Sequence, residues 1–166
     1  HGMPPVVVPT IDERAAAAGR FGLADRPYVL YPAITHPHKR HALLVAMLRS
    51  LAEHGDRDTA LVLIGGLGTA EADVQRAIAE TGVADRVVRP GRVSDHERDA
   101  LLAGATALVF PSEYEGFGAP VIEAMLLGTP VVCSAHPALR EVAGDAAIVV
   151  AESDGAAWAA AVTDAG

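Results

Sequence analysis

Short apolar runs alternate along the chain with longer segments in which apolar residues recur at helical spacing. The runs have the length and bounding residues of buried strands, and the longer segments have the period of amphipathic helices. The runs predict six strands, at residues 28–32, 60–64, 86–89, 107–110, 131–133 and 146–150. The periodic segments predict helices at 40–53, 71–81, 94–103 and 120–127, with a final helical stretch around Trp158 and a short helix at 15–18.

End signals support two of these helices. Ser94 is expected as an N-cap, and Glu97 three residues later completes the pattern of a capping box. Pro120 suits the first turn of a helix, where its missing N–H does no harm. Gly128 then ends the helix that Pro120 opens.

Buried strands that alternate with helices indicate an α/β fold. We expect one Rossmann-like domain with a doubly wound parallel sheet of about six strands. Ligands of such sheets bind beyond the carboxyl ends of the strands. The loops after Pro32, Ile64, Arg89 and Phe110 are therefore where a site is expected.

Composition fits a globular domain. The chain has 166 residues, of which 51% are hydrophobic and 20% charged, enough for one domain with a core. No apolar run approaches the roughly 20 residues that span a bilayer, and no leader pattern opens the chain. Residues 1–3 resemble a cloning remnant, so we expect the domain to occupy 4–166. The expected location is cytoplasmic, with peripheral membrane binding of a longer protein left open.

Charge and cysteine content exclude several classes. A formal net charge of −8 argues against nucleic acid and anionic membranes as partners. Cys133 is the sole cysteine, which excludes a disulfide framework and a cysteine-based metal cluster. Because Cys133 stands in the apolar run VVCS, we expect a buried, unreactive thiol.

The loop after Phe110 reads PSEYEGFGAPVIE, and two glycines flank Phe117 in it. Glycine lets backbone approach a ligand, and the helix that follows offers unpaired N–H groups to a phosphate. Glu123 stands in an otherwise apolar stretch, where a buried carboxylate needs a partner and could accept two hydrogen bonds from ribose. Two glutamates at this spacing are usually solvated acids beside a turn, but these surroundings favour a site.

This segment resembles a known family. Glu115 and Glu123 form Glu-x7-Glu, and EGFGAPVIEAMLLGTPVVCS is similar to the signature of the family-4 retaining glycosyltransferases, also called group 1. The pieces VLIGGLG, RPGRVSDHE and ALREVAGDAAIVV are similar as well, so the resemblance runs from Tyr28 to Trp158. It implies the C-terminal, donor-binding half of a two-domain enzyme of the B-type (GT-B) fold, truncated at both ends, whose N-terminal acceptor domain would be a partner.

The resemblance also implies roles for single residues. Glu115 would bind hydroxyls of the transferred sugar, and Glu123 would hold the nucleotide ribose. Gly65 and Val93, on neighbouring loops, would lie near the ribose or base. Sugar and diphosphate would contact the backbone of Gly116, Phe117, Gly118 and Ala119.

The loop after Pro32 reads AITHPHKRH. Enzymes of this family usually place an arginine and a lysine here against the donor diphosphate; Lys39 matches the lysine at the start of a helix, and the arginine is missing. Lys39, helped by Thr35, His38 or Arg40, would stabilise charge on the departing diphosphate without a metal. A solvated helix start is the simpler interpretation, but cations there oppose the helix dipole.

Two weaker patterns occur near this loop. His36, His38 and His41 could suggest a metal site, but no acidic or cysteine partner is nearby in sequence, and we expect no metal. The glycines from Gly65 to Gly68 miss the GxGxxG spacing of dinucleotide sites. A strand-to-helix turn is the simpler interpretation of these glycines, with nucleotide contact as the alternative.

The expected function is to bind a nucleotide-diphospho-sugar, such as a GDP- or UDP-sugar, for retaining transfer of a hexose to an acceptor hydroxyl. Mannose or a related sugar is suggested by the Pro-His-Lys variant, and no cofactor is expected. The isolated domain should bind this donor without transferring its sugar. A non-catalytic nucleotide-binding module and a nucleotide-sugar epimerase-like domain stay as alternatives. A nicotinamide-dependent oxidoreductase would need a GxGxxG after the first strand, which is absent.

Overall fold

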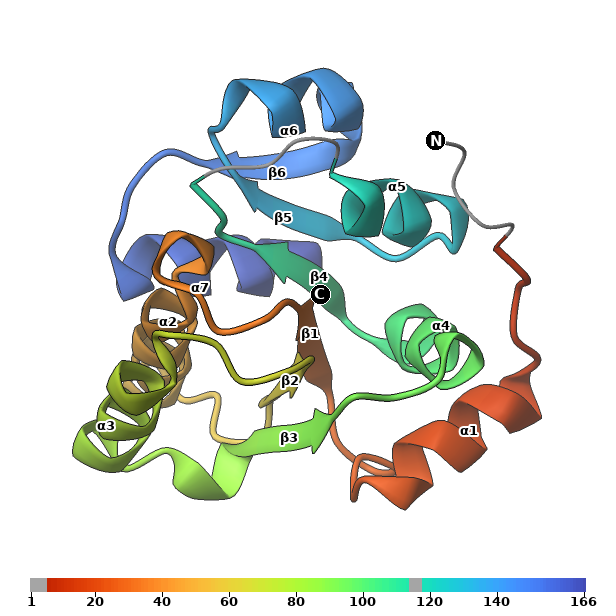
Figure 1. Cartoon of the computed structure of the whole chain (residues 1–166), viewed down its shortest axis with the longest axis horizontal. Coiled ribbons are helices and arrows are strands. Elements are labelled where there is room, and N and C mark those ends of the chain that lie inside the picture. Colours follow the sequence, from red (N-terminus) through yellow and green to blue (C-terminus); the bar gives the residue numbers. More distant parts are fainter. Residues whose placement is uncertain (1–5, 114–117) are drawn as a thin grey trace.

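The computed structural model describes residues 6–113 and 118–166. Its centre is a six-stranded sheet in the order β3-β2-β1-β4-β5-β6, and every neighbouring pair is parallel (Figure 1). The predicted α/β fold with one doubly wound parallel sheet is confirmed. The strands are β1 (Tyr28–Pro32), β2 (Ala60–Ile64), β3 (Val87–Gly91), β4 (Ala107–Phe110), β5 (Val131–Ser134) and β6 (Ala147–Val150).

Helices cover both faces of this sheet. On one face α2 packs against α3 and α7, and on the other α1 packs against α4 and α5 against α6 (Figure 1). The strand order reverses between β1 and β4, which is where ligands bind in doubly wound sheets. The α-helices are α1 (Ile11–Arg20), α2 (His41–Glu53), α3 (Glu71–Thr81), α4 (Asp95–Gly104), α5 (Ala119–Leu126), α6 (Pro137–Ala143) and α7 (Gly155–Ala165). Short 3-10 turns are η1 (Pro37–Lys39), η2 (Ala84–Arg86) and η3 (Gly144–Ala146).

The helix ends follow the expected capping chemistry with some differences. Ser94 is the N-cap of α4 and its hydroxyl accepts the Glu97 N–H, as predicted, while the Glu97 carboxylate contacts Arg20 of α1. The helix predicted at 15–18 is longer, because Thr10 and Glu13 form a full capping box at its start. Helix α6 was not predicted.

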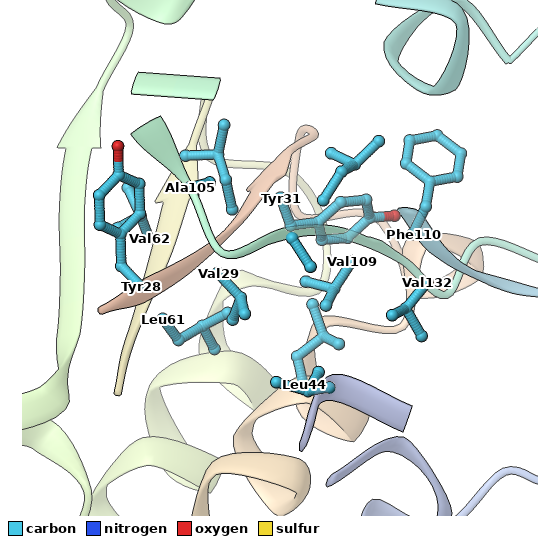
Figure 2. Close-up of a cluster of buried hydrophobic side chains, with 14 of the residues drawn as sticks. Tyr28, Val29, Tyr31, Leu44, Leu61, Val62, Ala105, Val109, Phe110 and Val132 are labelled. Atoms are coloured by element: carbon cyan, nitrogen blue, oxygen red, sulfur yellow. The ribbon is translucent and has the colours of Figure 1, made fainter. Parts of the chain in front are cut away.

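The core lies where β1, β2 and β4 meet the helices on both faces. Figure 2 shows Tyr31 beside Phe110, whose ring centroids are 5.4 Å apart in an edge-to-face arrangement. Central parallel strands are buried on both faces, which explains their unbroken apolar sequence. Cys133 is fully buried as predicted, and burial raises the pKa of its thiol to about 11.

Candidate functional site

The carboxyl ends of the parallel strands meet at one edge of the sheet. Backbone hydrogen bonds join the loops there: the N–H groups of Ala33, Gly65 and Glu113 donate to the carbonyls of Ile64, Gly91 and His38 at 2.9, 2.9 and 2.8 Å. The described residues predicted for the site lie on this edge: Lys39 after β1, Gly65 after β2, Val93 after β3, and Gly118 and Ala119 after β4. The fold thus brings these loops together, although their roles remain predictions.

Gly65 has a structural reason to be glycine. Its φ is 125°, and a Cβ there would lie 3.0 Å from the carbonyl oxygen of Ala33. A Cβ on Gly68 would lie 2.7 Å from the carbonyl oxygen of Thr35. The loop after β2 therefore packs backbone against backbone on the loop after β1, which supports the turn interpretation of these glycines.

An ion-pair network joins two of the strand-end loops, those after β1 and β2, to strand β3. Arg89 of β3 binds Glu71 of α3 through both guanidinium Nη atoms, at 2.5 and 2.7 Å. The Thr35 hydroxyl donates to Glu71 at 3.1 Å and accepts the Gly68 N–H at 2.7 Å. Hydrogen bonding from Arg89 lowers the pKa of Glu71 to about 2, so this carboxylate is ionised. Sequence reasoning missed this pair, because its partners stand in different elements.

Lys39 ends the 3-10 turn η1, two residues before α2 begins at His41, so the predicted helix start at Lys39 was wrong. The Tyr31 hydroxyl, buried beneath the loop, donates to the Lys39 carbonyl at 2.9 Å. Arg40 between them has a left-handed backbone, with φ 59° and ψ 41°. That conformation turns the chain sharply, and the Tyr31 bond holds the turn in place.

The Arg40 side chain is not a solvated helix start. Its Nη2 donates to the Ser153 hydroxyl at 2.6 Å, and its Nε lies 3.7 Å from a carboxylate oxygen of Glu113. Arg40 therefore ties the loop after β1 to the loops after β4 and β6. This contact supports the Lys39 loop from the side.

The three histidines have separate environments. His41 is 2% exposed, its Nε2 lies 3.2 Å from the Ala33 carbonyl oxygen, and burial lowers its pKa to about 4. The rings of His36 and His38 stack at 5.9 Å. Among residues 6–113 and 118–166, no three histidine, cysteine, aspartate or glutamate side chains are grouped to hold a metal ion.

The loop between β4 and α5, which contains Gly116 and Gly118, is described only at its two ends. Glu115, Gly116 and Phe117 lie outside the described residues, so their predicted roles are untested. Gly118 is the N-cap of α5 with φ 72°, a conformation that favours glycine. A glycine N-cap has no side chain to bind the first N–H groups of the helix. Pro120 has no N–H, and the Val121 N–H donates to the Gly118 carbonyl at 3.0 Å, so Ala119 supplies the N–H that an anion could take.

Glu123 is buried, and an arginine that the sequence did not single out lies beside it. Glu123 is 4% exposed, and its Oε2 lies 3.0 Å from Nη2 of Arg98 on α4. The same guanidinium nitrogen lies 3.5 Å from Asp99. Burial raises the pKa of Glu123, and Arg98 opposes this. Sequence reasoning missed Arg98, whose only signal was a charge in the first turns of a helix that follows a strand-end loop.

Arg92 and Val93 lie in the loop between β3 and α4. Val93 is partly buried and packs against the core. The Arg92 guanidinium lies against the glycine loop after β2, since a Cβ on Gly66 would be 3.4 Å from its Nη2. Arg92 is thus a further cation at this edge that the sequence did not single out.

Comparisons with known proteins identify a family for most of the chain. Residues 17–165 match the family described as "Glycosyl transferases group 1". The chain is 38% identical to O-antigen chain mannosyltransferase B of Escherichia coli over 136 residues. This match covers 81% of the chain and 35% of the relative. It is 43% identical to MMP alpha-(1->4)-mannosyltransferase of Mycolicibacterium hassiacum over 107 residues. This match covers 64% of the chain and 24% of the relative.

Solved structures share the fold. The Anabaena protein HepE, solved in complex with UDP and glucose, superposes with a TM-score of 0.83 at 20% identity, over 94% of this chain and 43% of that one. The chain therefore spans well under half the length of the relatives that it matches. Within the described part of the chain, none of the helices has the length and apolar character needed to cross a membrane.

Proposed function

The chain belongs to the group 1 glycosyltransferases, and from that membership we propose that it is the donor-binding domain of a retaining enzyme. Its ligand would be a nucleotide-diphospho-sugar, and the enzyme would transfer a hexose to an acceptor hydroxyl. Two curated relatives are named as mannosyltransferases, which favours mannose as the transferred sugar. The donor would be a GDP- or UDP-sugar, and the structural neighbour HepE was solved with UDP.

The observation that carries this proposal is the buried carboxylate of Glu123. It stands on α5, one turn past the glycine N-cap Gly118, at the edge where the strands end. A carboxylate that is 4% exposed there has lost its water, and hydroxyl donors of a bound ligand would compensate it. Ribose supplies two adjacent hydroxyls of the right kind.

The neighbouring groups suit a diphosphate. The N-terminus of α5 presents the Ala119 N–H and the positive end of a helix dipole, and Lys39 brings a positive charge from the loop after β1. Both would stabilise the charge that the diphosphate gains as the bond to the anomeric carbon breaks. In the proposed reaction the acceptor oxygen bonds to that carbon on the same face, and its proton passes to the leaving diphosphate. Configuration is thereby retained, and no metal or other cofactor is required.

A second domain would complete the site. This chain covers 35% and 24% of the two curated relatives, so most of each relative lies outside the matched segment. In the proposal, an N-terminal domain binds the acceptor and closes over the strand-end loops. We place the enzyme in the cytoplasm, with peripheral contact to a membrane through the longer protein.

The proposal predicts selective binding of one nucleotide class. A thermal-shift panel of UDP, GDP, ADP and their sugar-linked forms should stabilise the chain with one base only, by about 2.7 kcal/mol at a ligand excess of 100 times Kd. Glu123→Ala should weaken the binding of both free nucleotide and nucleotide-sugar, because both contain the ribose. Glu115→Ala should weaken only the preference for the sugar-linked form.

Glu80→Ala is the matched control for these variants. Glu80 is exposed near the C-terminal end of α3, away from the strand-end loops, so its loss should leave every affinity unchanged. Equal losses of affinity for free nucleotide in the Glu115 and Glu123 variants would contradict the proposed division of roles. Absence of binding across the whole panel would overturn the donor-binding proposal.

A further inference from the structure

Arg98 and Glu123 face each other at the ligand edge from two different helices. Arg98 is the fourth residue of α4, and Glu123 is the fifth residue of α5. These helices follow β3 and β4, so their N-terminal turns lie beside the carboxyl ends of the strands. Arg98 thus connects the loop that holds Val93 to the carboxylate proposed to bind ribose.

The Arg98–Glu123 ion pair makes fewer contacts than the Arg89–Glu71 ion pair. Arg89 and Glu71 form a bidentate pair with two short hydrogen bonds, at 2.5 and 2.7 Å. Arg98 approaches Glu123 through the single nitrogen Nη2, which lies 3.0 Å from Oε2. Buried polar atoms without a hydrogen bond are rare in proteins, and this cluster has three: Arg98 Nε, Asp99 Oδ1 and Glu123 Oε2. The cluster has unused bonding capacity that a polar ligand could take.

Arg98 favours the ionised form of Glu123 against the effects of burial and of nearby acids. Burial disfavours the carboxylate anion, and Asp99 and Asp95 of α4 add negative charge beside it. Arg98 is the cation that opposes all three effects among the groups acting on Glu123. A neutral carboxyl would present a hydroxyl in place of an acceptor oxygen and would bind ribose hydroxyls less well.

We propose that Arg98 is a positioning residue for nucleotide binding, which holds Glu123 as an oriented carboxylate anion from across the helix pair. The inference rests on the proposed ribose role of Glu123 and extends it to α4. Arg98 acts through Glu123, so its effect should vanish once Glu123 cannot ionise. Loss of Arg98 should also make nucleotide affinity depend on pH.

The test compares Arg98→Gln, Arg98→Lys, Glu123→Gln and the double variant Arg98→Gln/Glu123→Gln. Carbon-13 NMR of the ligand-free chain follows the Glu123 carboxyl titration, and calorimetry gives Kd for UDP and GDP from pH 5 to 8. In Arg98→Gln the Glu123 titration should move toward neutral pH by about one pH unit or more. Affinity should then fall by up to about tenfold for each pH unit below that titration and recover toward pH 8. Arg98→Lys should restore most of both, because it keeps the charge.

Glu123→Gln should bind weakly at every pH, and the double variant should match it. Arg76→Gln removes an exposed arginine paired with Asp73 on α3 and serves as the matched control. An unchanged Glu123 titration in Arg98→Gln would overturn the inference. So would a loss of affinity that is equal at all pH values and adds to that of Glu123→Gln. If the unaltered chain binds neither UDP nor GDP, the proposed function fails, whereas the ligand-free titration still decides whether Arg98 holds Glu123 ionised.

Discussion

At the scale of single residues, burial and pairing decide which charges the folded chain carries. His41 is 2% exposed against the Tyr31 ring and is neutral at pH 7, because burial lowers its pKa to about 4. Glu71 is held ionised far below its usual range by Arg89. Both groups stabilise the strand-end loops at neutral pH and lose that effect in acid, over different pH windows.

The His41 window predicts a measurable loss of stability. The unfolded chain takes up a proton at His41 as pH falls through about 6.5, whereas the folded chain resists protonation until about pH 4. The free energy of unfolding should therefore fall by about 2 kcal/mol between pH 6.5 and 5 and level off near pH 4 as far as His41 is concerned. Urea unfolding at several pH values measures this.

His41→Gln should remove most of that slope, while His96→Gln, at an exposed position on α4, should keep it. A slope that survives unchanged in His41→Gln would show that other groups cause the acid loss. The Glu71 contribution is separable, since it is present above pH 4.5 and disappears only as pH falls from there toward 2.

At the scale of elements, one close helix approach sets the position of α7. Gly155 opens α7 where it crosses α2, and a Cβ there would lie 2.5 to 2.8 Å from the backbone of Ala46 and Met47. Gly155→Ala should destabilise the chain by about 1 to 3 kcal/mol, because the helices must separate to fit a methyl group. Chemical unfolding gives the value.

Gly19→Ala is the matched control at this scale. Gly19 lies exposed in α1 with open space around it, so alanine there should raise stability by about 0.5 to 1 kcal/mol through its helix propensity. The two substitutions are chemically identical, and opposite signs would assign the difference to the packing of α2 on α7. A stabilising Gly155→Ala would contradict the close approach.

At the scale of the whole molecule, the proposal predicts binding without transfer. The chain should bind a nucleotide-sugar at the strand-end loops yet transfer no sugar, because acceptor binding and closure are assigned to a domain outside it. Labelled GDP-mannose or UDP-glucose incubated with hydroxyl acceptors tests this, with a full-length mannosyltransferase relative as the positive control. Sustained transfer by this chain would contradict the division into two domains, and inverted products from a longer protein would contradict the retaining mechanism.

The elements were predictable where local burial dictates the pattern. The bounds of β1, β2 and β4 match the apolar runs, since these central strands are covered on both faces. Helix α6 has seven residues, of which Leu139 and Ala143 are buried, too few to show a helical period. The start of α2 was predicted too early, because Arg40 has a left-handed backbone there. No glycine or asparagine marks that turn in the sequence.

The sequence by itself determined the order of the strands and of the longer helices along the chain, the parallel sheet and the loops that gather at its edge. Hydrophobic period and backbone stereochemistry act over a few residues, so they can be read along the chain. Only the tertiary structure decided that Arg98 pairs with Glu123 and Arg89 with Glu71, and that His41 is neutral. Charge and protonation depend on burial and on distances across separate elements, which the folded packing alone sets.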